Sequence, residues 1–222
     1  MALSRAARVA KRLLGTYVRG TVVSDRYKAY SFIEGERHQV CWAHLRRDFE
    51  RMAQRAGEPG IIGRKLVAMT KKLFALWGKW HEGKLDEAVW RAEVAAVRFR
   101  VRGLLERGAS LSVREHERSV RTLTRNTCRE LLAIEVSLWT MVEREGVEMT
   151  NNAAERALRH AVLWRRASFG SQSARGAEVV ARLLTVVMTR RLQGASAHAW
   201  LRDTCVAALE RRPVPSLVAP SI

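Results

Sequence analysis

Aspartate is the scarcest charged residue in this sequence. Its 222 residues include only four aspartates, and no acidic residue of either kind precedes the first of them, Asp25. Any chemistry that needs several carboxylates must therefore draw on few positions. Basic residues are abundant instead: 40 Lys and Arg stand against 22 Asp and Glu, for a net charge of +18. Such an excess indicates a polyanionic partner, most simply nucleic acid.

Cysteine is also rare, and long apolar runs are missing. The three cysteines are far apart, which favours a reducing, intracellular environment over a disulfide framework. No apolar run is long enough to span a bilayer, so an anionic membrane surface is the weaker alternative partner. The acid-free, Arg-rich start MALSRAARVAKRLL has the composition of a transit peptide.

Strand signals are confined to two short stretches. TVV at 21–23 is β-branched and is followed closely by Asp25, and HQVCW at 38–42 is the second candidate. Two strands are too few for an independent sheet. Either they pair with something outside this chain, or the chain is the later part of a larger fold.

Helical spacing dominates the rest of the chain. Helices are predicted at 4–14, 26–33 (short), 43–56, 178–192 and 197–212, and as a continuous helical block from 61 to about 147. GEPG at 57–60 is predicted to break the chain, ASFGSQSARGA at 167–177 to form a loop, and PVPSLVAPSI at 213–222 to form a tail. The tryptophans of the block are interpreted as core residues: Trp77, Trp80, Trp90 and Trp139.

Asp25 has two interpretations. Ligands gather at the carboxyl ends of strands in open α/β sheets, so a carboxylate there can hold a metal ion. An aspartate there can equally be the N-cap of the following helix, and Ser24 is a second candidate for that cap. An N-cap stabilises its helix by about 1 kcal/mol. Position alone does not decide between them.

The stretch TNNAAERALR at 150–159 also has two interpretations. Asn152 as N-cap and Glu155 three residues later match a capping box, and Arg159 is placed to pair with Glu155 one turn on. A cap alone does not require Asn151, nor the basic residues that continue to Arg166. An active site is the alternative.

Three further features suit metal or phosphate binding. Cys41 and His44 offer half a zinc site, but no second Cys/His pair has matching spacing. Arg46 and Arg47 suit phosphate contact or a solvated helix face. LWRRASFGSQSARG at 163–176 is predicted to be a loop that binds the DNA backbone through Arg165, Arg166, Ser168 and Arg175.

Several long motifs, in order, resemble the transposases of the insertion-sequence 66 family. They are GTVVSDRYKAYSF, HQVCWAHLRRDFERMA, VEMTNNAAERALRHAVLWRRASFGSQSARGAEVVARLLTVVMTRR, and the closing AHAWLRD with PSLVAP. The resemblance covers nearly the whole chain and is strongest at 20–55 and 145–192. It implies an RNase H-like core in which two aspartates and a glutamate bind two Mg²⁺ or Mn²⁺ ions for DNA hydrolysis and strand transfer.

Asp25 matches the family's second catalytic aspartate and Glu155 its glutamate. The remaining motif residues would support this site: Asn151, Asn152, His44, Arg156 and Arg159. We therefore expect an α-dominated α/β fold, in which an incomplete RNase H-like core with about two remaining strands is interrupted by an all-helical insertion. The expected segments are the second part of the core (1–56), the insertion (57–147), the glutamate helix with its basic loop (148–192), and a C-terminal helix and tail (193–222).

The family's first aspartate lies upstream of every position in this chain. Asp48 and Asp86 are on helical stretches and are poor replacements. The acid-free start then resembles an internal helix of the family. We expect a C-terminal part of a bacterial transposase, cytoplasmic and nucleoid-associated, with little catalysis alone. Its expected partners are DNA (transposon ends and target) and a second copy or a full-length transposase, with no membrane partner.

Three alternatives to this interpretation remain. A separately encoded N-terminal part could complete the site. The chain could be an inactive DNA-binding or regulatory protein that acts on transposon ends or on the full-length transposase. It could also be a relic without function.

Overall fold

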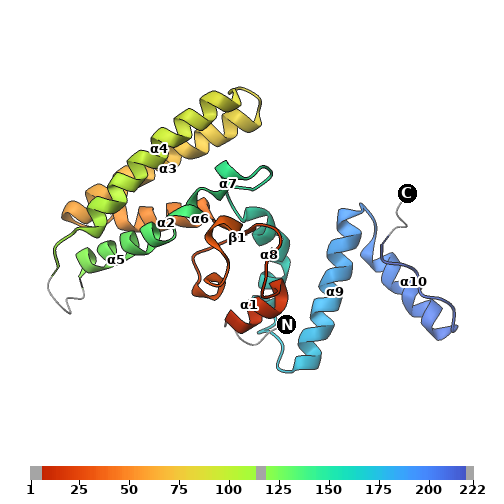
Figure 1. The fold of residues 1–222 in the computed structure, drawn as a ribbon. Coiled ribbons are helices and arrows are strands. Elements are labelled where there is room, and N and C mark those ends of the chain that lie inside the picture. The colour runs from red at the N-terminus through yellow and green to blue at the C-terminus, as the bar shows by residue number, and fades with distance from the viewer. Residues whose placement is uncertain (1–6, 114–118, 219–222) are drawn as a thin grey trace. The chain divides into compact units, whose positions relative to one another are not determined.

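The fold is known from a computed structural model, which describes residues 7–113 and 119–218 (Figure 1). The chain divides into two compact units, with the boundary between Asn151 and Asn152. The described residues of the predicted segments 1–56 and 57–147 all fall in the first unit. Parts of the predicted N-terminal helix (4–6), helical block (114–118) and tail (219–222) lie outside the described residues.

The two predicted strands are confirmed, and they pair with each other. Strand β1 (Val22–Ser24) is parallel to β2 (His38–Val40), with Val22 opposite His38 and Ser24 opposite Val40. Two 3-10 turns, η1 (Lys28–Tyr30) and η2 (Gly35–Arg37), lie between them. The short helix predicted at 26–33 is present only as the 3-10 helix η1, which covers 28–30.

Helices make up most of the rest of the first unit, as predicted. They are α1 (Ala7–Leu14), α2 (Trp42–Ala53), α3 (Gly57–His81), α4 (Glu87–Ala109), α5 (Val120–Ala133), α6 (Glu135–Leu138) and α7 (Thr140–Glu143). Helices α3 and α4 run side by side as a long hairpin, and α2 and α5 pack against it (Figure 1). The α-dominated fold class is confirmed, whereas the RNase H-like core remains a prediction.

The break predicted at GEPG (57–60) is wrong. Helix α3 begins at Gly57, and the chain turns earlier, between Ala53 and Gly57. Pro59 is accommodated because a proline in the first helical turn loses no hydrogen bond. Gly63 explains how tightly α3 can then approach α2, since a Cβ there would lie 2.3 Å from the backbone nitrogen of Ala53.

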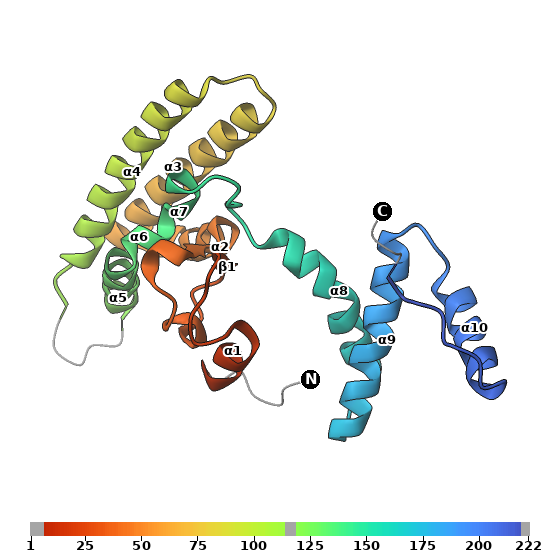
Figure 2. The same ribbon diagram turned by 45° about the vertical axis from the view of Figure 1, so that its right-hand side comes forward.

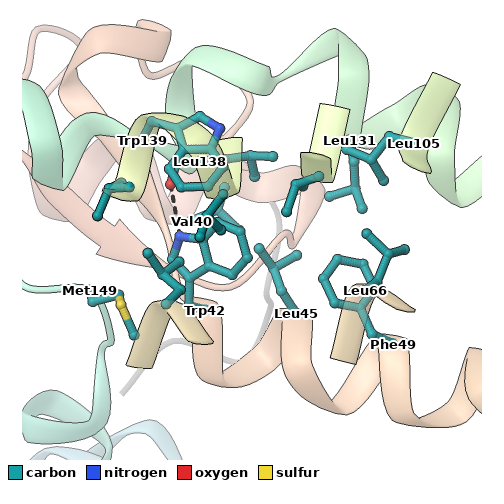
Figure 3. Packing of buried hydrophobic residues seen from close by; sticks show 14 of the residues in the cluster. Val40, Trp42, Leu45, Phe49, Leu66, Leu105, Leu131, Leu138, Trp139 and Met149 are labelled. Atoms are coloured by element: carbon teal, nitrogen blue, oxygen red, sulfur yellow. Dashed lines mark hydrogen bonds between the residues drawn. The ribbon is translucent and has the colours of Figure 1, made fainter. Parts of the chain in front are cut away.

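The hydrophobic core lies where α2, α3, α4 and the α5–α7 segment meet (Figure 3). The Trp42 and Trp139 rings pack with their centroids 5.0 Å apart, and the Trp42 indole N–H donates to the carbonyl oxygen of Leu138 at 2.8 Å. Trp90 is also fully buried, while Trp77 and Trp80 are partly buried against it. The predicted core role of the four tryptophans in the helical block is confirmed.

A buried glutamine joins β2 to the end of the helical block. Gln39 is fully buried, and its side-chain amide donates to the carbonyl oxygens of Val40 and Leu138. Its Oε1 accepts the backbone N–H of Met141 at 2.8 Å. Thr140 adds a hydrogen bond from its hydroxyl to the carbonyl oxygen of His38. These bonds fix the strand pair to the helical core.

The second unit contains α8 (Asn152–Ala167), α9 (Ala174–Leu192) and α10 (Ala197–Leu209). Figure 2 shows α9 and α10 joined by a short turn. The loop predicted at 167–177 is shorter than expected, because α9 begins at Ala174, where the Ser173 hydroxyl caps it by accepting the N–H of Gly176. None of the helices in the described ranges is long and apolar enough to cross a bilayer.

Candidate functional site

Asp25 follows the last residue of β1, at the carboxyl edge of the strand pair. The N–H of Cys41 donates to the carbonyl oxygen of Ser24 at 2.8 Å, so the two strands end side by side. The predicted placement of Asp25 just past a strand end is confirmed. It leaves the carboxylate half-buried in a surface pocket of about 340 Å³, which it shares with Tyr27, Tyr30 and the apolar face of α1.

One oxygen of the Asp25 carboxylate is engaged locally. Oδ1 accepts the backbone N–H of Tyr27 at 3.1 Å, which is a turn-stabilising bond. The structural interpretation of Asp25 is thus correct in part, although the residue preceding η1 is Tyr27 and not Asp25. Oδ2 makes no hydrogen bond to any residue in 7–113 or 119–218, so one carboxylate oxygen can serve a ligand.

Ser24, the last residue of β1, and His38, on the adjacent strand β2, support Asp25, and sequence reasoning predicted this role for neither. The Ser24 hydroxyl donates its single hydrogen to the carbonyl oxygen of Asp25 at 2.8 Å. Its oxygen lies 2.8 Å from His38 Nε2, so Nε2 carries the hydrogen of this second bond. Burial lowers the pKa of His38, and the negative charge of Asp25 opposes that shift. Only the strand register, invisible in the sequence, brings these residues together.

The segment that leads into α8 is attached to the same edge. The backbone N–H of Trp42 donates to the carbonyl oxygen of Met149 at 3.1 Å, and the N–H of Asn151 donates to the sulfur of Cys41 at 3.4 Å. Met149 and Cys41 are both buried. The predicted supporting residue Asn151 therefore contacts the residue that follows β2. Strand β2 pairs with β1, the strand that Asp25 follows.

Glu155 lies in the first turn of α8, as predicted, and its side chain is exposed. Arg156 and Arg159 follow it on the same exposed helix. The sequence predicts Asn152 as the N-cap, but helix α8 begins at Asn152 itself, which is therefore the first helical residue. Helix ends vary by a residue or two between criteria, and the capping box remains a prediction.

The remaining aspartates of the first unit have structural roles. Asp48 on α2 pairs with Arg26 and Arg51, at 2.6 Å in each case. Asp86 caps α4 by accepting the N–H of Ala88 at 2.8 Å. Within residues 7–113 and 119–218, no three His, Cys, Asp or Glu side chains gather into a group that could hold a metal ion.

The predicted DNA-binding residues occupy helix ends and exposed helix faces. Arg46 and Arg47 are exposed on α2, where Arg46 pairs with Glu50 at 2.8 Å. Arg165 and Arg166 lie in the last turn of α8, and Arg175 lies in the first turn of α9.

The predicted binding loop at 163–176 is accordingly wrong in its extent, because only residues 168–173 are non-helical. The Ser168 hydroxyl bonds the carbonyl oxygen of Trp164 and ends α8. Phe169 beside it has a φ of 57° and is 96% exposed. The arginines predicted to lie on this loop flank it instead.

His44 lies in the first turn of α2, half-buried. Its partner in the proposed half zinc site, Cys41, receives the N–H of Asn151 on its sulfur. The pair thus lies at the same strand edge as Asp25, and its metal-binding role remains a prediction.

These features define a basic, helix-rich α/β protein with a carboxylate at the carboxyl end of a parallel strand pair. Comparison with known sequences identifies it further: the chain belongs to the Transposase IS66 family, whose profile matches residues 1–179. The resemblance noted from the motifs is confirmed.

Two relatives come from Sinorhizobium fredii (strain NBRC 101917 / NGR234), and both are called uncharacterized proteins. The protein y4hP is 46% identical over 69 residues, which are 31% of this chain and 12% of that protein. The protein y4jD is 24% identical over 215 residues, which are 90% of this chain and 40% of that protein. The chain thus spans less than half the length of either relative. No solved structure matched it.

Proposed function

We propose that this chain is part of a DNA transposase, which binds transposon-end DNA and contributes Asp25 and Glu155 to a two-metal site. The observation that carries the proposal is the position of Asp25. It follows a parallel strand, has one carboxylate oxygen without a protein partner in the described ranges, and matches an aspartate of the family motif. Glu155 is included because it matches the glutamate of the family motif, within the residues that the family profile covers.

The donor chemistry fits Mg²⁺ in type but falls short in number. Mg²⁺ prefers carboxylate oxygens and keeps several waters, and Asp25 and Glu155 supply such oxygens. The family site uses three carboxylates, however, and the described residues contain no cluster of three ligands. We therefore propose that a third carboxylate comes from elsewhere in a longer protein or from a separate chain, and we derive no reaction step from the incomplete set.

Iron-directed cleavage tests the metal site without requiring catalysis. The chain, bound to duplex DNA from the regions that flank its coding sequence, is loaded with Fe²⁺ in place of Mg²⁺. Ascorbate and peroxide then generate radicals that cut the backbone near the ion. Cuts near residues 25 and 155 are expected in the same preparation, and excess Mg²⁺ is expected to suppress both.

Carboxamide variants provide the matched controls. Asp25→Asn and Glu155→Gln should each reduce both cuts, because both side chains would hold the same ions. Asp203→Asn, on the exposed face of α10, should change neither. Two results would show that the two carboxylates do not form one site. One is that no cuts occur, and the other is that the cut near one carboxylate persists when the other carboxylate is replaced.

A regulatory DNA-binding role is the second candidate. It is favoured by the net charge of +18, which supports binding to DNA through phosphate contacts that need no metal. This role predicts strongly salt-dependent DNA affinity that Asp25→Asn leaves unchanged, together with failure of the iron-cleavage experiment.

A further inference from the structure

A second pocket lies beside the one that contains Asp25, and the side chains of Tyr27 and Tyr30 line both. It has a volume of about 510 Å³ and is formed by the loop between β1 and β2 together with α5 and α6. Binding sites for small organic ligands have volumes of roughly 300–1,000 Å³. The pocket is thus large enough for a nucleotide, and it adjoins the candidate catalytic carboxylate.

Two tyrosines are among the residues that line this pocket. Tyr27 is 48% exposed, and Tyr30 is half-buried, with its ring centroid 6.4 Å from that of His38. The buried side chain of Ile33 adds apolar surface. Exposed aromatic faces beside an apolar surface favour flat, unsaturated ligands, and a nucleobase stacks well on such rings.

His38 adds a hydrogen-bond acceptor to the lining. Its Nε2 bonds Ser24, while Nδ1 makes no hydrogen bond within residues 7–113 and 119–218. Because burial lowers the pKa of His38, the ring stays neutral near pH 7, and Nδ1 is then an acceptor. The exocyclic amino groups of adenine and cytosine, which are hydrogen-bond donors, suit such an atom.

The charges at the pocket favour an anion. Arg26 is held by Asp48 at 2.6 Å and by Glu130, the carboxylate of the pocket, at 3.2 Å. Lys28 is exposed, and no carboxylate in the described ranges pairs with it. Glu130 is thus partly neutralised by Arg26, whereas the Lys28 ammonium group is available to a phosphate.

We propose that this pocket binds an unstacked nucleotide of a DNA strand, with the base against the Tyr27 and Tyr30 rings and a phosphate at Lys28. The proposal rests on the proposed DNA function and deepens it. A base held in this pocket would place the adjoining strand next to Asp25. The pocket would then favour a single strand or an unpaired end, because extracting a base from a duplex costs a few kcal/mol.

The test uses the full chain and 2-aminopurine, a fluorescent adenine analogue that is quenched when it stacks. Twelve-nucleotide oligo-dT strands carry one 2-aminopurine at the 5′ end, in the middle or at the 3′ end. Quenching is expected on binding, at one or more of these positions. Stacking on one aromatic side chain corresponds to roughly fivefold or more in affinity, so Tyr27→Ala should weaken binding by at least that factor and abolish quenching.

Matched variants separate stacking from other causes. Tyr27→Phe retains the ring and should retain quenching, and Tyr17→Ala removes an exposed tyrosine outside the pocket and should have no effect. Lys28→Glu should weaken binding of the strand. Because Tyr27 and Lys28 are exposed, these changes should leave the fold intact, which circular dichroism verifies.

The outcomes distinguish this proposal from the proposed function. Quenching that is equal in the wild type and in Tyr27→Ala, or absent while duplex DNA still binds, overturns the pocket proposal and leaves the DNA function standing. A chain that binds neither duplex nor single strand overturns both. If 2-aminopurine deoxynucleoside monophosphate alone is quenched with the same Tyr27 dependence and equal affinity, the pocket binds a free nucleotide, which overturns the strand assignment.

Discussion

The backbone N–H of Asn151 donates a hydrogen bond to the sulfur of Cys41, with the two atoms 3.4 Å apart. This bond joins the segment before α8 to the residue that follows β2, although the two are far apart in sequence. Cys41 is completely buried. A thioether or thiol sulfur is a weak acceptor, so this contact positions the segment more than it stabilises the fold.

Replacing Cys41 should therefore loosen this segment. In Cys41→Ala the acceptor is lost, and we expect the Asn151 amide to exchange with deuterium several-fold faster, with a loss of about 1 kcal/mol of unfolding free energy. Hydrogen exchange read by mass spectrometry on peptides spanning 145–155 measures this. Cys205→Ala, at an exposed cysteine, is the control. Unchanged exchange in Cys41→Ala would show that the sulfur does not hold the segment.

Gln39 should be among the most sensitive polar residues of the first unit. Gln39→Ala removes the partner of the Met141 N–H, at a buried position. It also removes one of two donors to the Leu138 carbonyl, which keeps its bond from the Trp42 indole N–H. An unsatisfied buried N–H costs about 1–3 kcal/mol, so we expect a loss of about 2 kcal/mol in urea unfolding. Gln54→Ala, at an exposed position on the turn after α2, should change stability by less than about 0.5 kcal/mol.

His38 should make stability depend on pH. Its pKa in the folded protein is below the ordinary value of 6.5, because of burial. Between the folded pKa and pH 6.5, the unfolded chain binds a proton at this residue that the folded protein does not. The free energy of unfolding is therefore highest above about pH 6.5 and declines as the pH falls towards the folded pKa. His38→Asn should flatten this part of the stability curve relative to the wild type.

Asp25 can be tested through the same histidine. Its negative charge raises the pKa of His38 and so opposes the effect of burial. Asp25→Asn should therefore move the His38 pKa further down, as measured by NMR titration of the ring protons. Asp203→Asn on α10 is the control. A His38 pKa that is the same in Asp25→Asn as in the wild type would show that the Asp25 carboxylate is not close to the ring.

Arg46 and Arg47 should differ in DNA binding although they are adjacent. Arg46 is paired with Glu50, whereas no described carboxylate pairs with Arg47. Arg47 can thus meet a phosphate without breaking an existing pair. Arg47→Ala should reduce the slope of log affinity against log salt by about one, and Arg46→Ala should reduce it by less. Fluorescence anisotropy across a salt series measures both, and equal slopes would reject this distinction.

Most of the fold could be anticipated locally. The spacing of Ile62, Leu66 and Leu73 marks the buried face of α3, and the β-branched TVV marks β1, because these patterns reflect short-range geometry. The errors also have local causes. The composition of GEPG at 57–60 predicts a break, but the first turn of a helix tolerates the proline in it. Ser173 caps α9 inside a stretch whose composition is typical of a loop.

The sequence by itself determined the helix-rich character, the basic charge, the position of Asp25 after a strand and the family motifs. These properties depend on composition and on the spacing of residues that are close together in the sequence. Only the tertiary structure decided that His38 and Ser24 meet beside Asp25, that Asn151 bonds Cys41, and that Tyr27 and Tyr30 line two adjoining pockets. Strand register and packing bring distant residues together, and no local pattern specifies which residues will meet.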